Sequence, residues 1–238
     1  MTRRIATILA RAGSKGLAGK NTRPFLGEPL LVRTVRQALR TGLFNVVVVS
    51  SDSQDFLDLG RSAGAQETVL RPVDLANDTA TKPPGIRHAV MECEARGHAA
   101  FDTVVDLAVT SPLRGDADIS GAIALLEQTN ARLVLSGQEA KDNPYFNILE
   151  ETPTGDYALS KRPDILVSAR QAAPRCIALN GAVYVWQRDE ILRKDDTVVR
   201  EGLKVLVMPE DRSIDVDTET DFRVAEFLAQ QQSEDGAS

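Results

Sequence analysis

The sequence predicts an α/β fold in which a mostly parallel sheet carries helices on both faces. Short apolar runs, of which residues 5–10 and the β-branched run 46–49 are the clearest, have the composition of buried strands. Between such runs, apolar residues recur at helical spacing over 10–15 residues. Strands that alternate with helices of this length form parallel sheets, because each crossover helix returns the chain to the same edge.

The expected elements follow one another in a regular order. A helix is predicted to begin near Pro29, which suits a first helical turn, and to end at Gly42. The pattern Thr218-x-x-Asp221 is typical of a capping box and predicts the start of the last helix. The other strands are expected at residues 68–70, 103–109, 131–136, 180–186 and 204–208, and the other helices after residue 53, at 86–93 and at 119–126.

The alternation stops between Glu139 and Cys176. This stretch holds four prolines and three aromatic residues, and a structureless run of this length is unusual inside a compact domain. We interpret residues 139–176 as a small hairpin and arm that packs on another subunit. The arm is inserted in a single domain that spans residues 1–238. The alternative is a long ordered surface loop.

Composition excludes several classes of function. A net charge of −6 argues against nonspecific nucleic-acid binding. No apolar stretch approaches the ~20 residues that a membrane span requires, and the apolar run after Arg4 is too short for a secretory signal. Cys93 and Cys176 lack the spacing of a metal site and the density of a disulfide scaffold, so a cytoplasmic location is expected.

The loop after the first strand is the first candidate site. Glycines let a backbone approach a ligand closely, and loop N–H groups with nearby cations make a cradle for phosphate. Ligands in open α/β sheets sit at the carboxyl ends of strands, where this loop lies. The loop therefore predicts a nucleoside triphosphate site, and a flexible turn with ordinary surface charges is the alternative. Its glycines and cations are Gly13, Gly16, Gly19, Arg11, Lys15 and Lys20.

The spacing in this loop disfavours a P-loop kinase or ATPase. A Walker A loop has four residues between its glycines and a hydroxyl residue after its lysine. Here five residues separate Gly13 from Gly19, and Asn21 follows Lys20. The hydroxyl that would hold magnesium is therefore missing.

Asp215 and Asp217 form a second candidate site, between the last strand and the last helix. Residues two apart in extended chain point to the same side, about 6.6 Å apart. Two carboxylates placed in this way suit Mg²⁺ or Mn²⁺ bridging to a phosphate. The alternative is that one of them only starts the following helix. A cationic loop combined with a metal site is what phosphoryl and nucleotidyl transfer require.

Other polar residues have more ordinary interpretations. Asp52 is expected to cap the helix that follows it. His88 and His98 are expected to be structural or surface residues, and Cys93, on the apolar face of its helix, is expected in the core. We therefore nominate no histidine as a catalytic base.

Five separated stretches form one pattern: ARAGSKGLAGKN (residues 10–21), RPVDLANDTA (71–80), TSPLR (110–114), NGAVYV (180–185) and SIDVDTETDF (213–222). In this order and spacing they resemble the acylneuraminate cytidylyltransferases, which make CMP-activated nonulosonic acids. The resemblance covers most of residues 5–230. Its first and last motifs are the most specific.

The resemblance implies a glycosyltransferase-A-like, Rossmann-like nucleotidyltransferase fold and a homodimer whose arm reaches the partner's active site. It implies that CMP passes from CTP to the anomeric hydroxyl of a nonulosonic acid, with Mg²⁺ or Mn²⁺ and release of pyrophosphate. The residues that it implicates are Arg11, Ser14, Lys15, Lys20 and Asn21 for the triphosphate and sugar of CTP, Arg71, Asp78, Thr79 and Ala80 for cytosine, Asp215 and Asp217 for the metal, and Arg170, Asn180 and Tyr184 for the acceptor.

The chain departs from the family members that use N-acetylneuraminate. Ala108 and Val109 stand where those members have Gln-Pro before Thr-Ser-Pro-Leu-Arg, Phe146 stands where they have a lysine in the arm, and Ala178 stands where they have an arginine. These departures, with the patterns NPYFN and LNGAVYVW, favour legionaminic acid or a similar diacetamido nonulosonate as acceptor. Lys82 stands where those members have a small hydroxyl residue, and the sequence gives no reason for it.

Four alternatives remain open. The chain could be a CMP-N-acetylneuraminate synthetase proper, or a cytidylyltransferase for 3-deoxy-manno-octulosonate, although the latter usually lacks Gly-Ser-Lys-Gly in its first loop. A sugar-phosphate nucleotidyltransferase would use UTP or GTP. A non-catalytic nucleotide-binding regulator belongs to a different class, and the intact Lys20, Asp215 and Asp217 argue against it.

Overall fold

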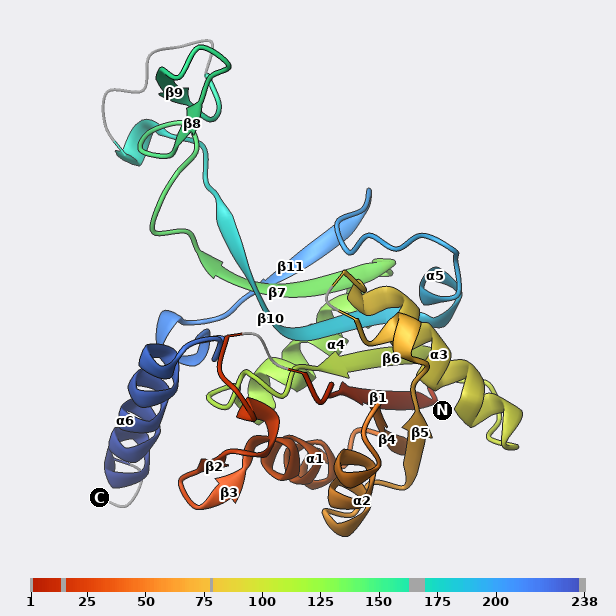
Figure 1. The fold of residues 1–238 in the computed structure, drawn as a ribbon. Helices are drawn as coiled ribbons and strands as arrows, with labels where there is room; N and C mark the ends of the chain where they lie inside the picture. Colours follow the sequence, from red (N-terminus) through yellow and green to blue (C-terminus); the bar gives the residue numbers. More distant parts are fainter. Residues whose placement is uncertain (1, 14–15, 78, 163–169, 236–238) are drawn as a thin grey trace.

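The computed structural model describes residues 2–13, 16–77, 79–162 and 170–235, and within them the centre of the molecule is a seven-stranded sheet (Figure 1). The strand order is β11-β7-β10-β6-β1-β4-β5. Six of these strands run in one direction, and β10 is antiparallel to both of its neighbours. The strands are β1 (Arg4–Leu9), β4 (Val46–Ser51), β5 (Glu67–Leu70), β6 (Thr103–Leu107), β7 (Leu133–Glu139), β10 (Ile177–Gln187) and β11 (Leu203–Val207).

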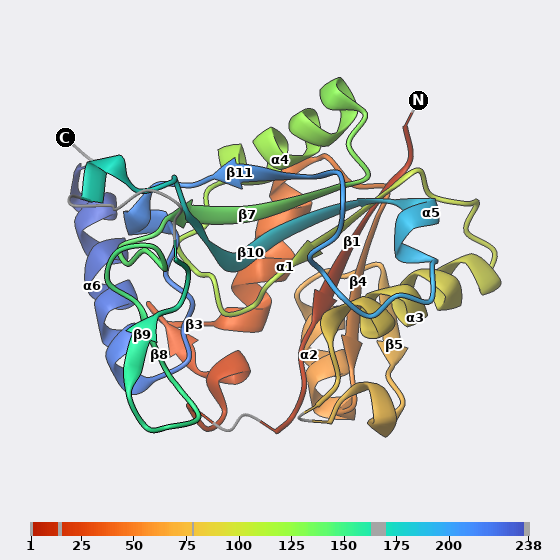
Figure 2. The same ribbon diagram turned by 90° about the horizontal axis from the view of Figure 1, so that it is seen from above.

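Helices cover both faces of the sheet (Figure 2). Successive residues of a strand point to opposite faces, and β1 shows the consequence. Ala6 and Ile8 join the core beneath α1, α2, α4 and α6, whereas Ile5 joins the core beneath α3 and α5. The helices are α1 (Leu30–Thr41), α2 (Gln54–Ser62), α3 (Lys82–Ala95), α4 (Asp116–Thr129), α5 (Arg188–Ile191) and α6 (Glu219–Asp235).

Two small antiparallel ribbons complete the described fold. β2 (Pro24–Phe25) and β3 (Glu28–Pro29) pair before α1. β8 (Leu149–Glu151) and β9 (Tyr157–Leu159) form a hairpin in the arm, which projects away from the sheet in Figure 1. The hairpin expected from the sequence is therefore present, and the packing of the arm on another subunit stays a prediction.

The predicted α/β class, with a mostly parallel sheet and helices on both faces, is confirmed. The alternation of strands and helices did not predict the antiparallel direction of β10. The chain leaves β7 at Glu139 and re-enters the sheet at Ile177, and these two residues are register partners. The described residues between them, 140–162 and 170–176, contain no α-helix that could act as a crossover, and the arm leaves and returns at the same edge. β10 must therefore run antiparallel to β7.

Two further findings concern predictions made above. Cys93 is buried in the core, as expected. Among the described residues, no helix has both the length and the apolar character needed to cross a bilayer.

A buried carboxylate connects two distant segments next to the last strand. Asp118, in the first turn of α4, accepts the backbone N–H of Gly115 at 2.8 Å. It also accepts Nε and Nη2 of Arg212, both at 3.0 Å, and this contact raises the pKa of the arginine. Arg212 lies in the short 3₁₀ helix η4 (Glu210–Arg212), directly before the segment that carries Asp215 and Asp217. Asp118 therefore fixes the start of that segment.

Replacing Asp118 by alanine is expected to lower the free energy of unfolding by about 2 kcal/mol, because a helix-capping bond and a bidentate pair are lost together. For a chain of this size the melting temperature would fall by about 6 °C. Thermal unfolding followed by circular dichroism measures this, with Asp58→Ala as the matched control. Asp58 makes an exposed ion pair, whose loss should cost less than ~0.5 kcal/mol. Equal melting temperatures for the two variants would contradict the role given to Asp118.

Candidate active site

The predicted motifs meet at the carboxyl edge of the parallel strands. The loops that follow β1, β5 and β6 and the segment before α6 surround one cavity of about 500 Å³. Four cationic side chains and the carboxylate of Asp217 contribute to its wall. The lining residues are Leu9, Arg11, Gly16, Lys20, Asn21, Arg71, Leu75, Ala76, Asn77, Ala80, Lys82, Thr110, Asp217 and Thr218. We call this space the nucleotide cavity.

The first loop is held by two side chains that satisfy its backbone. The side-chain amide of Asn21, which is buried, donates to the carbonyl of Arg11 at 3.0 Å. Asp52, at the end of the neighbouring strand β4, accepts the N–H of Ala12 at 2.9 Å. The expectation that Asp52 caps α2 is therefore wrong. Ser53 holds the N-cap position, and because β1 and β4 are adjacent and parallel, Asp52 lies beside the backbone of the first loop.

Lys20 joins the first loop to the last motif. Its ammonium contacts Oδ1 of Asp217 at 2.6 Å and the carbonyl of Val216 at 3.0 Å. The approach is so close at Gly16 that an added Cβ would overlap the carbonyl oxygen of Asp217. Glycine is therefore required at position 16 by the packing of the two segments.

Arg71 is the buried cation of the nucleotide cavity. It follows β5, is 6% exposed, and its Nε has no hydrogen-bond partner among the described residues. Burial lowers its pKa, and the charges of Asp52 and Asp106 oppose that shift. The side chain lines the cavity, and a buried donor without a partner is costly. Ala80 also lines the cavity, whereas Thr79 lies outside its wall, bonded to Asn77.

Asp215 and Asp217 lie on either side of a buried residue, Val216, whose N–H donates to the carbonyl of Thr110 at 2.8 Å. Desolvation by the surrounding protein raises the pKa of Asp215, although the residue is exposed to a cavity. A hydrogen bond from Thr110 opposes the shift, and the charge of Asp217 adds to it. The two carboxylates are therefore close enough to interact electrostatically, and their convergence on one metal site stays a prediction.

This donor set fits a divalent cation. A cation between two mutually repelling carboxylates stabilises the charge of both. Among the described residues, no group of three His, Cys, Asp or Glu side chains is placed to hold a metal ion. Phosphate oxygens and water would therefore supply the other ligands, as is usual for Mg²⁺.

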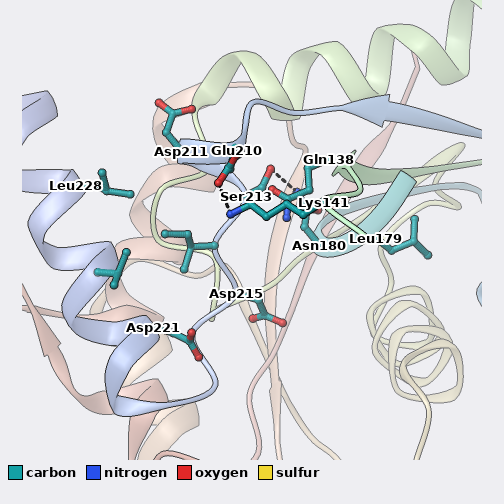
Figure 3. A pocket seen from close by; sticks show the side chains of 12 residues that line it. Gln138, Lys141, Leu179, Asn180, Glu210, Asp211, Ser213, Asp215, Asp221 and Leu228 are labelled. Carbon is teal, nitrogen blue, oxygen red and sulfur yellow. Dashed lines mark hydrogen bonds and ion pairs between the residues drawn. The ribbon is translucent and has the colours of Figure 1, made fainter. Parts of the chain in front are cut away.

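A second cavity, of about 760 Å³, is lined by Asp215 (Figure 3). Figure 3 shows Gln138, Lys141 and Asn180 at one end of it and Asp221 on α6 at the other. Lys141 pairs with Glu210, and Oε1 of Gln138 is buried without a hydrogen-bond partner among the described residues. The cavity thus offers amide, cationic and carboxylate groups to a polar molecule. We call it the acceptor cavity.

Asn180 is placed by an irregularity in β10. Register partners advance from Leu179 to Tyr184 on β10 while β7 advances only from Gly137 to Leu135. Gly181, with φ of +68°, makes this bulge possible. Asn180 is 7% exposed and bonds to Ser136 at 2.6 Å and Ser213 at 3.0 Å. Its amide is therefore fixed in orientation at the wall of the acceptor cavity.

Three predicted acceptor residues differ in their placement. Asn180 lines the acceptor cavity. Tyr184 is buried in the sheet, and neither cavity is lined by it. Arg170 is exposed in the arm, in the 3₁₀ helix η3 (Arg170–Ala172), away from both cavities of this chain. The predicted residues Ser14, Lys15 and Asp78 lie outside the described residues.

The arginine of the TSPLR motif is a structural residue. Arg114 is 3% exposed and donates to the carbonyls of Ala108 and Ala182 and to the side chain of Gln37. Burial lowers its pKa to about 10. It therefore ties the end of β6 to the bulge of β10, beside Asn180.

Sequence reasoning missed an ion pair in the floor of the site. Nζ of Lys82, a residue without explanation in the sequence, lies 3.3 Å from Oδ2 of Asp106 in β6. The signal that could have found the pair was present: Asp106 is a charged residue inside a strand that is otherwise buried and largely apolar. Such a charge requires a partner.

A covered α/β sheet with a cationic loop and paired carboxylates at its carboxyl edge defines a nucleotide-dependent transferase. The comparisons agree. The sequence profile of the family described as "Cytidylyltransferase" matches residues 5–174, and the chain belongs to this family. It is 34% identical over 224 residues to a CMP-N,N'-diacetyllegionaminic acid synthase of Campylobacter jejuni, covering 94% of each chain. It is 33% identical to the post-translational flagellin modification protein B of Campylobacter coli, covering 98% of this chain and 97% of that protein.

Among solved structures, the fold is similar to that of a CMP:2-keto-3-deoxy-manno-octonic acid synthetase complexed with CTP. The TM-score is 0.69 over 97% of this chain and all of that one, at 15% identity. This likeness supports the predicted nucleotidyltransferase fold.

Removal of the Asp52 carboxylate is expected to loosen the first loop without unfolding the protein. In Asp52→Ala the N–H of Ala12 loses its acceptor, so amide exchange of residues 10–13 should accelerate by about tenfold. Hydrogen exchange followed by mass spectrometry or NMR measures this. The control is Asp55→Ala, an exposed position in the first turn of α2. Unchanged protection of the loop in Asp52→Ala would contradict the role of this carboxylate.

Proposed function

We propose that this protein is a cytidylyltransferase that transfers CMP from CTP to the anomeric hydroxyl of a nonulosonic acid and releases pyrophosphate. One observation carries the proposal: the cationic first loop and Asp217 line the same cavity, and Lys20 joins them at 2.6 Å. The cavity is therefore suited to a triphosphate, and Asp215, two residues before Asp217, lines a second cavity suited to a polar acceptor.

The acceptor is of the legionaminic type. The similarity to a synthase of CMP-N,N'-diacetyllegionaminic acid over 94% of each chain supports this choice. So do the departures at Ala108, Phe146 and Ala178, which remove polar or cationic groups that the N-acetylneuraminate-using members have. The alternatives are N-acetylneuraminate itself and the eight-carbon octulosonate.

The residues of the nucleotide cavity have distinct roles in this reaction. Arg11, Lys20 and Asn21 bind the triphosphate and sugar of CTP, and Arg71 with Ala80 frames the cytosine. The oxygen of the anomeric hydroxyl forms a bond to the α-phosphorus, the bond from that phosphorus to the bridging oxygen breaks, and the electron pair leaves with pyrophosphate. Arg11 and Lys20 neutralise the charge that develops on the leaving group.

Asp215 and Asp217 would hold Mg²⁺ or Mn²⁺, which would supply Lewis-acid stabilisation of charge on oxygen. The proton of the hydroxyl passes to solvent. No histidine is assigned as a base, since His98 pairs with Glu67 at 2.8 Å in β5 and His88 lines neither cavity. Asn180 orients the acceptor in its cavity, and Arg170 reaches the corresponding site of a second subunit.

The central experiment measures pyrophosphate release with CTP and Mg²⁺ against four acceptors: N-acetylneuraminate, legionaminate, pseudaminate and 3-deoxy-manno-octulosonate. Turnover with legionaminate alone, or far above the others, is expected. Preference for N-acetylneuraminate would retain the reaction and contradict the choice of acceptor. CTP binding without turnover on any acceptor would favour a non-catalytic regulator.

Two variants test the site. Lys20→Ala and Asp217→Asn are expected to lower kcat by about 10²–10³-fold, because each removes a charge aimed at the reacting phosphates. Their melting temperatures should change little, since the side chain of Asp217 is 66% exposed. The control is Asp189→Asn, a carboxylate that is 94% exposed and distant from both cavities. Near-normal turnover in either site variant would show that the assignment is wrong.

We also propose a homodimer formed through the arm. Four apolar or aromatic side chains of the arm are more than a third exposed, which is unusual for so short a segment unless a partner covers them. They are Phe146, Ile148, Leu149 and Tyr157. A cytoplasmic location is consistent with the free thiols of Cys93 and Cys176.

Sedimentation velocity tests the assembly. The wild-type chain is expected to sediment as a dimer, and Leu149→Asp with Tyr157→Asp as a monomer, because two charges would be buried in the contact. The control is Phe227→Asp, an exposed position on α6 outside the arm. A monomeric wild-type protein would overturn the proposal.

A further inference from the structure

Lys82 and Asp106 form an ion pair that the proposed reaction does not yet use. The side chain of Asp106 is 2% exposed in the centre of β6, between β1 and β10. Its Oδ1 accepts the hydroxyl of Thr7 at 3.1 Å, and its Oδ2 lies 3.3 Å from Nζ of Lys82. A buried carboxylate fixed by two neighbours gives the lysine ammonium a permanent counter-ion in the floor of the site.

The protein contacts that the ammonium of Lys82 makes do not use all of its hydrogen-bond donors. Besides Asp106, it contacts the carbonyl of Gly181 at 3.3 Å and lies 4.9 Å from the centre of the Tyr184 ring. An ammonium has three N–H donors, and the described residues provide acceptors for two of them at distances that are long for charged hydrogen bonds. One N–H and part of the positive charge are left for another acceptor.

The side of the ammonium without these contacts opens into the nucleotide cavity. The side chain of Lys82 is 38% exposed, and it lines the cavity together with Arg11, Lys20 and Arg71. Its protein contacts lie at the boundary of the two cavities, because Gly181 follows Asn180 of the acceptor cavity. Burial alone would lower the pKa of Lys82, but the charges of Asp106, Tyr184 and Asp215 raise it above its ordinary value. The lysine therefore remains a cation at the boundary where the two reactants meet.

We propose that Lys82 is a further substrate-binding residue, whose ammonium binds an anionic oxygen of the reactants at the junction of the two cavities. The inference rests on the proposed cytidylyl transfer and deepens it. Two reactant groups have this chemistry: the α-phosphate of CTP and the carboxylate of the acceptor. The α-phosphate is favoured, because Lys82 lines the nucleotide cavity and not the acceptor cavity.

The role follows from the charges. A non-bridging oxygen of the α-phosphate gains negative charge as the attacking and leaving oxygens share the phosphorus, and a fixed cation stabilises that charge without reorganisation. Lys82 transfers no proton in this role. Asp106 and the Tyr184 ring position the ammonium and touch no reactant.

The decisive test compares two variants whose effects on nucleotide binding would be the same if the ion pair had only a structural role. Lys82→Met removes the cation with little change of shape, and Asp106→Asn removes its counter-ion. If the pair only stabilised the fold, both variants would weaken nucleotide binding to a similar degree. If Lys82 binds the nucleotide, Lys82→Met should raise the Kd for CTP by about tenfold or more, since a charge-assisted hydrogen bond is lost. Asp106→Asn should lower the Kd, because the ammonium no longer shares its charge with a carboxylate.

Binding is measured by isothermal titration calorimetry with CTP, CMP and cytidine, each with Mg²⁺. The loss in Lys82→Met should be present for CTP and CMP and absent for cytidine, which has no phosphate. A normal affinity for all three with a raised KM for the acceptor would assign the anion to the acceptor carboxylate. Unchanged nucleotide affinity together with an unchanged acceptor KM overturns the proposal, as does equal weakening by both variants.

Two controls keep the outcome interpretable. Lys194→Met removes an exposed lysine outside both cavities and should leave CTP affinity unchanged. Lys82→Met leaves Asp106 without a counter-ion and is therefore combined with Asp106→Leu, in which no buried charge remains. The double variant should fold and still show the tenfold weaker CTP binding. Because calorimetry needs no turnover, the absence of activity in the wild-type protein would refute the proposed reaction without deciding the role of Lys82.

Discussion

The contact between Lys20 and Asp217 is the constraint on which the site depends. It joins the first loop to the segment before the last helix, 197 residues further along the chain. Lys20 lies in the short 3₁₀ helix η1 (Lys20–Thr22) and Asp217 in the segment before α6, both outside the sheet. Their meeting therefore depends on the sheet, which brings the end of β1 and the segment after β11 to one edge. Gly16 allows the two backbones to touch, and Asp118 holds the start of the second segment through Arg212. The cavity therefore exists only when both ends of the chain are folded.

The cationic side chains of the nucleotide cavity lie near carboxylates. Arg71 is buried near Asp52 and Asp106, which partly compensate its charge, and Lys20 lies against Asp217. Such pairs hold the cationic side chains in place before a ligand arrives, which reduces the entropy that binding must overcome. In the acceptor cavity the side chain of Asn180 is held in place by hydrogen bonds to Ser136 and Ser213 and not by an ion pair.

Much of the fold and the outline of the site could be predicted from the sequence, because both depend on periodicity and on local motifs. The strand direction of β10 could not, since an apolar run has the same pattern in either direction. The role of Asp52 was missed for a related reason: helix capping is a local rule, whereas its actual partner, Ala12, is adjacent only through the pairing of β1 with β4. Tyr184 was expected in the acceptor pocket, but the alternation along β10 places its side chain in the interior.

The burial of Asp106 beside Lys82 also restricts how this sequence can have changed over time. Losing the lysine first leaves a carboxylate alone in the middle of the sheet, and gaining the aspartate first has the same result. Either of these single steps lowers the free energy of unfolding, which is small in folded proteins of ordinary stability. Among descendants of a common ancestor, an aspartate at position 106 should therefore be accompanied by a cation at position 82, and lineages with a small residue at position 82 should have an uncharged residue at position 106.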